Sequence, residues 1–221
     1  MSERLIDILI TSLPKMLLAG VKVTVPLTVI SFAVSLVLGL ILALAQVGRG
    51  KIVSKLSKFY VWVFRGTPLI VQLFIIFFGL PSLGINIPAF PAAIIAFGLN
   101  LAAYNAEAIR AAILAIPVGQ MEAAEVLGYN YTQTMMRIIL PQALAIAYPS
   151  LSNNLISLLK DTSLAFSITV IEMFATAKQV ATRTYEPFAL YCEAAVIYLF
   201  FSTALTWLQD YLEKKMTWTS R

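Results

Sequence analysis

Residues 23–48 read "VTVPLTVISFAVSLVLGLILALAQVG" and contain no charged side chain. A helix needs about 20 consecutive apolar residues to cross a bilayer, so this run is long enough for one span. A second charge-free run, residues 66–106, is interrupted by Pro81, Pro88 and Pro91. These two runs predict membrane-spanning helices.

The composition extends this prediction to the whole chain. Of its 221 residues, 60% are hydrophobic and 12% are charged. A soluble domain is about half apolar and about a quarter charged, so this chain has too little charge to cover a water-facing surface. We therefore expect one all-α integral membrane domain over residues 1–221. Within residues 1–18, Glu3, Asp7 and Pro14 favour an interfacial amphipathic segment over a cleaved signal peptide.

The apolar segments predict about five transmembrane helices, at residues 20–47, 59–80, 89–112, 142–172 and 187–210. This arrangement divides the basic residues unequally between the two sides of the membrane. One side has Arg49, Lys51, Lys55, Lys58, Arg65, Arg110, Arg137, Lys214, Lys215 and Arg221. The other side has Arg4, Lys15, Lys22, Lys178 and Arg183. The positive-inside rule then places the N-terminus outside the cell and the C-terminus in the cytoplasm.

The long loop at residues 113–141 has a pattern of its own. Pro117 and Gly119 interrupt the preceding helix, "QMEAAEVL" follows as a helix-forming stretch, and Gly128 is a helix stop. The segment "YTQTMMRIIL" predicts a second short helix. Two short helices joined at a glycine suggest a docking surface for a cytoplasmic partner, although a plain connector remains an alternative.

Polar residues inside the predicted spans suggest a polar cavity. Asn100, Tyr104 and Glu107 share one helical face, and Arg110 is spaced to pair with Glu107. The fourth span contains Lys160 and Asp161 within "SLLKDTSLAFSI" (157–168), although a charge at the bilayer centre is costly. The candidates for a solute pathway are Arg65, Thr67, Asn100, Tyr104, Glu107, Asn154, Lys160, Asp161, Thr162 and Ser163.

Such a cavity suits a zwitterionic solute. Asp161 or Glu107 would meet its ammonium group, and Lys160 or Arg65 its carboxylate. Other interpretations stay open: Lys160 and Asp161 could neutralise each other and fix helix packing, Tyr104 could be ordinary core, and Arg65 could anchor the end of its helix. Buried acids also suit a proton relay.

Several kinds of chemistry have no support in this sequence. The chain has no histidine, a single cysteine (Cys192) and neither of the common glycine-rich nucleotide motifs. We expect neither enzyme activity nor a cofactor or metal site in this chain. The net charge of +5 fits a cytoplasmic membrane surface better than nucleic acid.

The segment "EAAEVLGYNYTQTMMRIILP" resembles the EAA signature of ABC importer permeases, with Glu122, Ala123, Ala124, Gly128, Ile138, Leu140 and Pro141 in register. "RGTPLIVQL" (65–73), "AYNAEAIRAAI" (103–113) and "KDTSL" (160–164) are similar to the polar amino-acid uptake branch. "KDTSLAFSITVIEMF" followed by "TRTYEPFALY" (182–191) is most similar to cystine permeases. Ala111 and Ala112 differ from the glycine pair that many relatives have.

This resemblance implies a type I importer permease in a bacterial inner membrane, surrounded by lipid. It implies a second permease copy or homologous sibling, two ATP-binding subunits that hold ATP and Mg²⁺, and an extracytoplasmic solute-binding protein. In such permeases the EAA segment is the coupling helix, which docks on the ATPase. Here it would make this contact through Glu122, Ala123, Ala124, Glu125 and Gly128. The solute would be L-cystine or a related polar amino acid. An ion-coupled secondary transporter is the alternative; a membrane enzyme and a scaffold have less support.

Overall fold

The computed structural model describes residues 3–218, and within that range it contains helices and connecting segments without a β-strand. Arg221, which was counted in the charge bias, lies outside the described residues. The helices are α1 (Glu3–Ala19), η1 (Gly20–Thr24), α2 (Val25–Val47), α3 (Lys51–Gly66), α4 (Leu69–Phe74), η2 (Ile75–Gly79), η3 (Leu80–Leu83), α5 (Ala89–Ala115), α6 (Gly119–Val126), α7 (Tyr131–Thr134), η4 (Met135–Ile139), α8 (Leu140–Asp161), η5 (Thr162–Ile168), α9 (Met173–Thr184) and α10 (Pro187–Trp218).

Three of these helical stretches in the described part of the chain are long and apolar enough to cross a membrane: 3–47, 89–115 and 187–215. Two bent pairs raise the count to as many as five spans. The first joins 51–66 to 69–83 at 103°, and the second joins 131–168 to 173–184 at 51°. The prediction of about five transmembrane helices is therefore confirmed.

Several predicted boundaries were wrong. The second span is not one helix over 59–80: α3 starts at Lys51, in the segment between the first two predicted spans, and ends at Gly66. Thr67 is extended (φ −119°, ψ 145°) because the ring of Pro68 excludes the helical conformation from the preceding residue. The segment 173–186, which the predicted spans left as a connection between the fourth and the fifth, is largely α9. The α1 segment continues through a π-helical turn into α2 without a gap.

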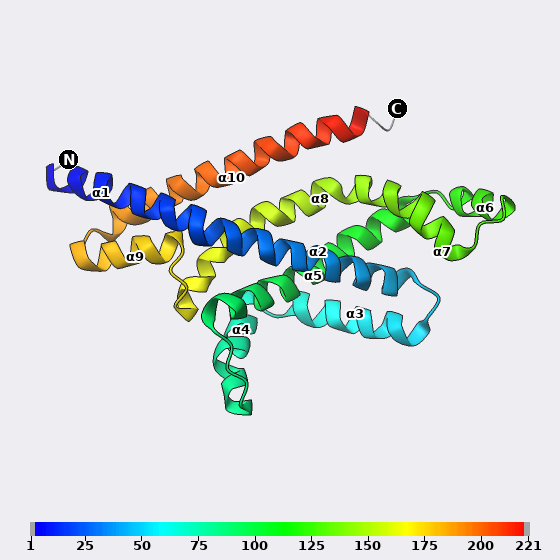
Figure 1. Cartoon of the computed structure of the whole chain (residues 1–221), viewed down its shortest axis with the longest axis horizontal. Helices are drawn as coiled ribbons and strands as arrows, with labels where there is room; N and C mark the ends of the chain where they lie inside the picture. The colour runs from blue at the N-terminus through cyan, green and yellow to red at the C-terminus, as the bar shows by residue number, and fades with distance from the viewer. Residues whose placement is uncertain (1–2, 219–221) are drawn as a thin grey trace.

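Helices α2 and α5 cross the centre of the molecule and pack closely together (Figure 1). The contacting face of α2 contains small residues about one helical turn apart, namely Ser31, Ser35, Gly39 and Ala43. Small residues allow transmembrane helices to approach, which replaces the hydrophobic driving force that is absent in lipid. A Cβ atom on Gly39 would lie 2.8 Å from the Cβ atom of Asn105.

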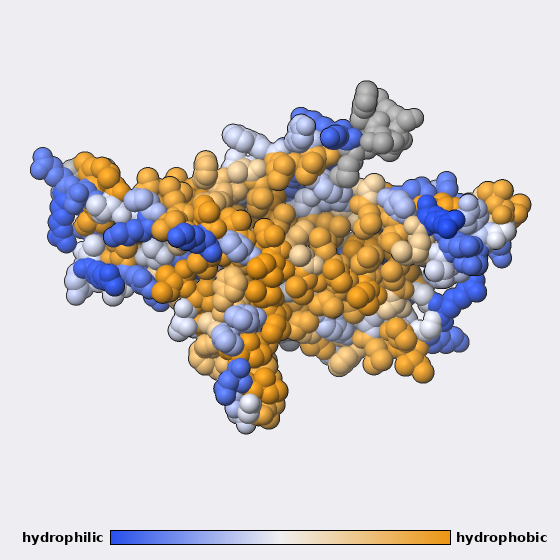
Figure 2. Space-filling view, viewed as in Figure 1, coloured by the Kyte–Doolittle hydropathy of each residue, from blue (hydrophilic) through white to orange (hydrophobic). Residues whose placement is uncertain are grey.

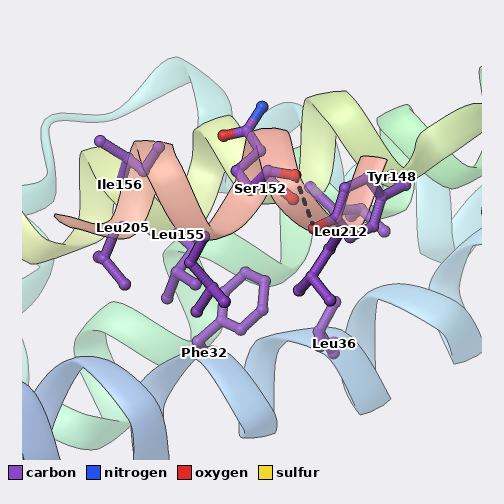
Figure 3. A pocket seen from close by; sticks show the side chains of 11 residues that line it. Phe32, Leu36, Tyr148, Ser152, Leu155, Ile156, Leu205 and Leu212 are labelled. Atoms are coloured by element: carbon purple, nitrogen blue, oxygen red, sulfur yellow. Dashed lines mark hydrogen bonds between the residues drawn. The ribbon is translucent and has the colours of Figure 1, made fainter. Parts of the chain in front are cut away.

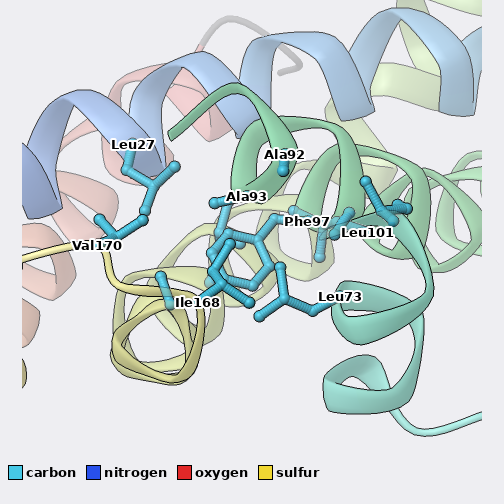
Figure 4. Packing of buried hydrophobic residues seen from close by; sticks show 12 residues of the cluster. Leu27, Leu73, Ala92, Ala93, Phe97, Leu101, Ile168 and Val170 are labelled. Carbon is cyan, nitrogen blue, oxygen red and sulfur yellow. The ribbon is translucent and has the colours of Figure 1, made fainter. Parts of the chain in front are cut away.

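A buried apolar cluster joins these two helices to the bent segments. Phe97 and Leu101 of α5 lie beside Leu27 of α2, Leu73 of α4 and Ile168 of η5 (Figure 4). The cluster fixes the positions of both bends relative to α5. The polar hollow described below lies between the same elements.

Hydrophilic residues gather at the two ends of the long axis, and apolar residues cover much of the face between them (Figure 2). Helices α6 and α7 lie at one end, whereas the N-terminus and α9 lie at the other (Figure 1). An apolar band between two polar ends is the surface expected of a protein that spans a bilayer. The chain is thus an all-helical, multi-pass membrane protein.

Candidate functional site: a polar hollow between the spans

A polar hollow of about 530 Å³ lies between the α3–α4 bend, α5 and α8. It contains six of the ten predicted solute-pathway residues: Arg65, Thr67, Asn100, Tyr104, Asn154 and Asp161. Gly66, Pro68, Leu69, Leu101, Ser157 and Leu164 complete its lining. We call this space the outer hollow. Its volume falls within the range of pockets that bind small molecules.

One wall of the outer hollow comes from α8 and η5. Asn154, Ser157, Asp161 and Leu164 are spaced by three, four and three residues, so they lie on one face of the helical segment. Asn154 is held in place because its Nδ2 donates to Oδ1 of Asn105 at 2.8 Å. Asn105 is fully buried and donates in turn to Oγ of Ser35 at 2.9 Å. This chain of hydrogen bonds joins α8 to α5 and α2.

The opposing elements are tied together by Gln72, which the sequence prediction missed. Its Nε2 donates to Oγ1 of Thr67 at 2.7 Å and to the carbonyl of Phe64 at 3.0 Å. Its Oε1 accepts from Nδ2 of Asn100 at 3.0 Å. Gln72 is buried within an apolar segment, and the only signal available in the sequence was an amide where the neighbours are aliphatic. It fixes the bend that places Arg65 and Thr67 at the hollow.

Four predicted pathway residues do not line the outer hollow. Lys160 and Ser163 line a different hollow, beside Tyr191 and Tyr198 of α10. Successive residues of a helix point about 100° apart, so Lys160 and its neighbour Asp161 face different spaces. Thr162 is fully buried, and its Oγ1 donates to the carbonyl of Leu159 at 2.6 Å.

The fourth such residue, Glu107, lies next to the outer hollow. The predicted ion pair with Arg110 is confirmed: Nε and Nη2 of Arg110 donate to the two carboxylate oxygens at 3.1 Å and 2.9 Å. Nη1 of Arg65 is 3.9 Å from the same carboxylate. The guanidinium of Arg65 also lies over the ring of Tyr104, 5.4 Å from its centroid.

Another hollow of about 250 Å³, between α2, α8 and α10, is lined mainly by Phe32, Leu36 and further leucine and isoleucine side chains (Figure 3). Its one drawn hydrogen bond joins the Tyr148 hydroxyl to the carbonyl of Gln209 at 3.5 Å. Its lining has no charged group to pair with the ammonium or the carboxylate of a zwitterion.

The 113–141 segment forms a surface at one end of the molecule. Glu122, Ala123, Glu125 and Gly128 are exposed, whereas Ala124 is buried. Gly128 ends α6 with φ +83°, and the Tyr129 N–H donates to the carbonyl of Ala124 at 3.0 Å, as in a glycine helix cap. The predicted helix 120–127 is confirmed as α6. The second predicted helix continues through η4 into α8 instead of ending at residue 140.

A multi-pass helical protein with a polar hollow between its spans and an ordered helix beyond them has the architecture of a membrane transport permease. Residues 35–218 match the family described as "Binding-protein-dependent transport system inner membrane component". The chain belongs to this family. The sequence left an ion-coupled secondary transporter open as an alternative. Membership in this family decides against that alternative.

Individual relatives agree with this assignment. The chain is 42% identical over 211 residues to the L-cystine transport system permease protein TcyB of Bacillus subtilis (strain 168), covering 95% of this chain and 90% of the relative. The L-cystine transport system permease protein TcyL of the same organism is 39% identical over 207 residues, covering 90% and 87%. A solved structure described as an amino acid ABC transporter with histidines superposes with a TM-score of 0.84 at 33% identity, covering 93% of this chain and 97% of that one.

Proposed function

We propose that this chain is the permease subunit of an ATP-driven amino-acid importer, with L-cystine or a related polar amino acid as its solute. The observation that supports the proposal best is the outer hollow, which has a carboxylate from Asp161 and a guanidinium from Arg65 in one space of about 530 Å³. Opposite charges from different helices suit the ammonium and the carboxylate of an amino acid. The curated relatives described as L-cystine permeases support the choice of solute.

In this proposal Asp161 binds the ammonium group and Arg65 the carboxylate, while Thr67, Asn100, Tyr104 and Asn154 shape the pocket. Lys160, Ser163, Thr162 and Glu107 support it from neighbouring positions. The chain pairs with a second copy or a homologous sibling. An extracytoplasmic binding protein delivers the solute, and two ATP-binding subunits supply the energy with their own ATP and Mg²⁺.

The proposed contact with these ATP-binding subunits is the surface of α6. Its exposed carboxylates, Glu122 and Glu125, lie next to exposed Val126 and Leu127. An apolar patch with a charged rim is typical of a protein interface. Closure of the ATPases would move the two α6 helices together and rotate the spans as rigid bodies, opening the pathway to the outside. The proposal therefore places α6 on the cytoplasmic side of the membrane and the N-terminus on the outer side.

Proteoliposomes that contain the purified complex and the binding protein test the solute pathway directly. Asp161→Asn keeps the side-chain shape and removes the charge, so we expect uptake to fall about tenfold or more, the loss of one charge-assisted contact. Competition with cystine, glutamine, histidine and arginine identifies the preferred solute. Unchanged uptake in Asp161→Asn would contradict the role of this carboxylate. Loss of assembly together with uptake would instead indicate a packing role.

Reversing a charge on α6 tests the coupling surface. Glu122→Arg is expected to reduce solute-stimulated ATP hydrolysis and uptake together, because a cation replaces a carboxylate at the interface. Glu186→Arg at the opposite end of the molecule is the matched control and should leave coupling intact. Co-purification of ATPase subunits with the tagged chain checks the partner itself. If the chain never brings down an ATPase, or Glu122→Arg transports normally, the importer proposal fails.

A further inference from the structure

A second hollow, of about 470 Å³, adjoins the outer one. We call it the inner hollow; its lining is Gln46, Lys58, Val61, Trp62, Arg65, Gly66, Tyr104 and Glu107. Arg65, Gly66 and Tyr104 line both spaces, so these three residues form the boundary between them. Gln46 comes from the last turn of α2, so the inner hollow extends toward the end of the molecule that bears α6 (Figure 1).

At this boundary, the carboxylate of Glu107 is held by close hydrogen bonds, whereas the guanidinium of Arg65 is held only loosely. Arg110 binds both oxygens of Glu107 at 2.9 Å and 3.1 Å, whereas Arg65 reaches that carboxylate only at 3.9 Å. The Arg65 side chain is 46% exposed, and it lies next to Gly66, where an added Cβ would have no neighbour within 4 Å. Glu107 therefore stays satisfied by Arg110 when Arg65 moves. A solute carboxylate can take the place of Glu107 as the partner of Arg65.

The inner hollow has an unused donor of its own. Gln46 is only 8% exposed, and its amide lies near the Glu107 carboxylate. Its Nε2 nevertheless has no hydrogen-bond partner of acceptable geometry among the described residues. A buried donor left unpaired costs about 1–3 kcal/mol, which an acceptor in the hollow would recover. Because Arg110 already pairs with Glu107, Lys58 and Arg65 are cations still available to a ligand here.

We propose that the inner hollow is a second station for the solute, where Gln46, Lys58 and Arg65 bind its carboxylate. Arg65 carries the carboxylate across the boundary by exchanging Glu107 for it, and the Tyr104 ring, stacked under the guanidinium, closes the boundary when the solute is absent. This inference rests on the proposed amino-acid import and extends it by one step toward the α6 end. The recognised group is a carboxylate on a small amine-bearing solute.

Protection of single cysteines from a maleimide reports the occupancy of each hollow in the purified complex without the binding protein. In a Cys192→Ser background, Ser157→Cys reports on the outer hollow and Trp62→Cys on the inner one. The probes are L-cystathionine, a thioether analogue of cystine that cannot exchange with thiols, and its diamide, which lacks both carboxylates. We expect L-cystathionine to protect both positions and the diamide to leave Trp62→Cys unprotected.

The variant Gln46→Leu separates the two stations. It removes the unpaired donor at similar volume, so the concentration of L-cystathionine that protects Trp62→Cys should rise about tenfold, the loss of one hydrogen bond to a charged group. Protection of Ser157→Cys should stay unchanged, which also shows that the variant is folded. Gln142→Leu, an exposed residue whose amide bonds only within its own helical segment, is the matched control.

The possible results distinguish this inference from the proposed function. Protection of Ser157→Cys without protection of Trp62→Cys overturns the second station and leaves the outer hollow as the solute site. Equal protection of Trp62→Cys by the diamide overturns carboxylate recognition there. Protection of neither position contradicts the solute pathway itself.

Discussion

Gln72 has more polar partners than its apolar surroundings suggest. Its Nε2 lies within 3.2 Å of three acceptors, and its Oε1 accepts from Asn100. The amide joins the end of α3, the extended Thr67 and the middle of α5 at one point. A buried network of this kind is stable only when every member has its partners.

Replacing Gln72 by leucine should destabilise the protein by about 2 kcal/mol, because the buried amide of Asn100 loses an acceptor and the carbonyl of Phe64 loses a donor. We expect a lower thermal midpoint for the purified complex and reduced uptake, since Arg65 and Thr67 are no longer fixed at the outer hollow. Gln142→Leu serves as the control, because Gln142 is exposed and bonds only to the carbonyl of Ile138. Equal midpoints for the two variants would contradict this role of Gln72.

Residue type and helical spacing were sufficient to find part of the site. Asn100, Tyr104 and Asn154 are polar where the sequence predicts membrane, and they do line the outer hollow. The same reasoning placed Lys160 in that hollow, although it faces another one. Lys160 and Asp161 are adjacent in the sequence, and the sequence alone does not reveal which of the two faces a given space. That depends on the rotation of α8 about its axis, which distant contacts with α5 and α10 determine.

At the scale of elements, the number of spans followed from apolar length, but the bends did not. The ring of Pro68 excludes the helical conformation from Thr67, so a break was available from local chemistry. Its angle of 103° depends on Gln72 and on the packing of Leu73 against α5. Other prolines, Pro14 and Pro149, lie inside continuous helices. A proline alone therefore does not predict where a span divides.

The close approach of α2 and α5 gives a prediction for Gly39. Any side chain there meets Asn105 at 2.8 Å and the backbone of Ala102 at 3.2 Å, so Gly39→Leu should separate the two helices. We expect a cost of about 1–3 kcal/mol, the usual range for overpacking, visible as a lower thermal midpoint and a smaller yield of assembled complex.

Gly79→Leu is the matched control for this substitution. At Gly79 an added Cβ meets only Ile75, at 3.8 Å, which is ordinary van der Waals contact. The same side chain should therefore be tolerated there. A Gly39→Leu complex as stable as Gly79→Leu would show that α2 can move away from α5 without cost, and would contradict the small-residue interface.

At the scale of the whole molecule, the two polar ends differ in what they carry. One end has α6, the α2–α3 connection and the start of α8; the other has α9 and the beginning of α10 (Figure 1). At the first end Arg49 lies over the ring of Tyr131, 5.2 Å from its centroid, which joins the α2–α3 connection to α7. This contact links α7 to the connection between α2 and α3, two of the helices that line the inner hollow.

The charge bias predicts that the α6 end is cytoplasmic and the α9 end is outside. Gln120, on α6, and Thr182, on α9, are both exposed and lie at opposite ends of the protein. In a Cys192→Ser background, a membrane-impermeant maleimide should label Thr182→Cys but not Gln120→Cys in intact spheroplasts. Inverted membrane vesicles should give the opposite pattern. Permeabilised membranes, where both positions must react, are the control, and labelling of Gln120→Cys in intact spheroplasts would reverse the orientation and with it the proposed direction of transport.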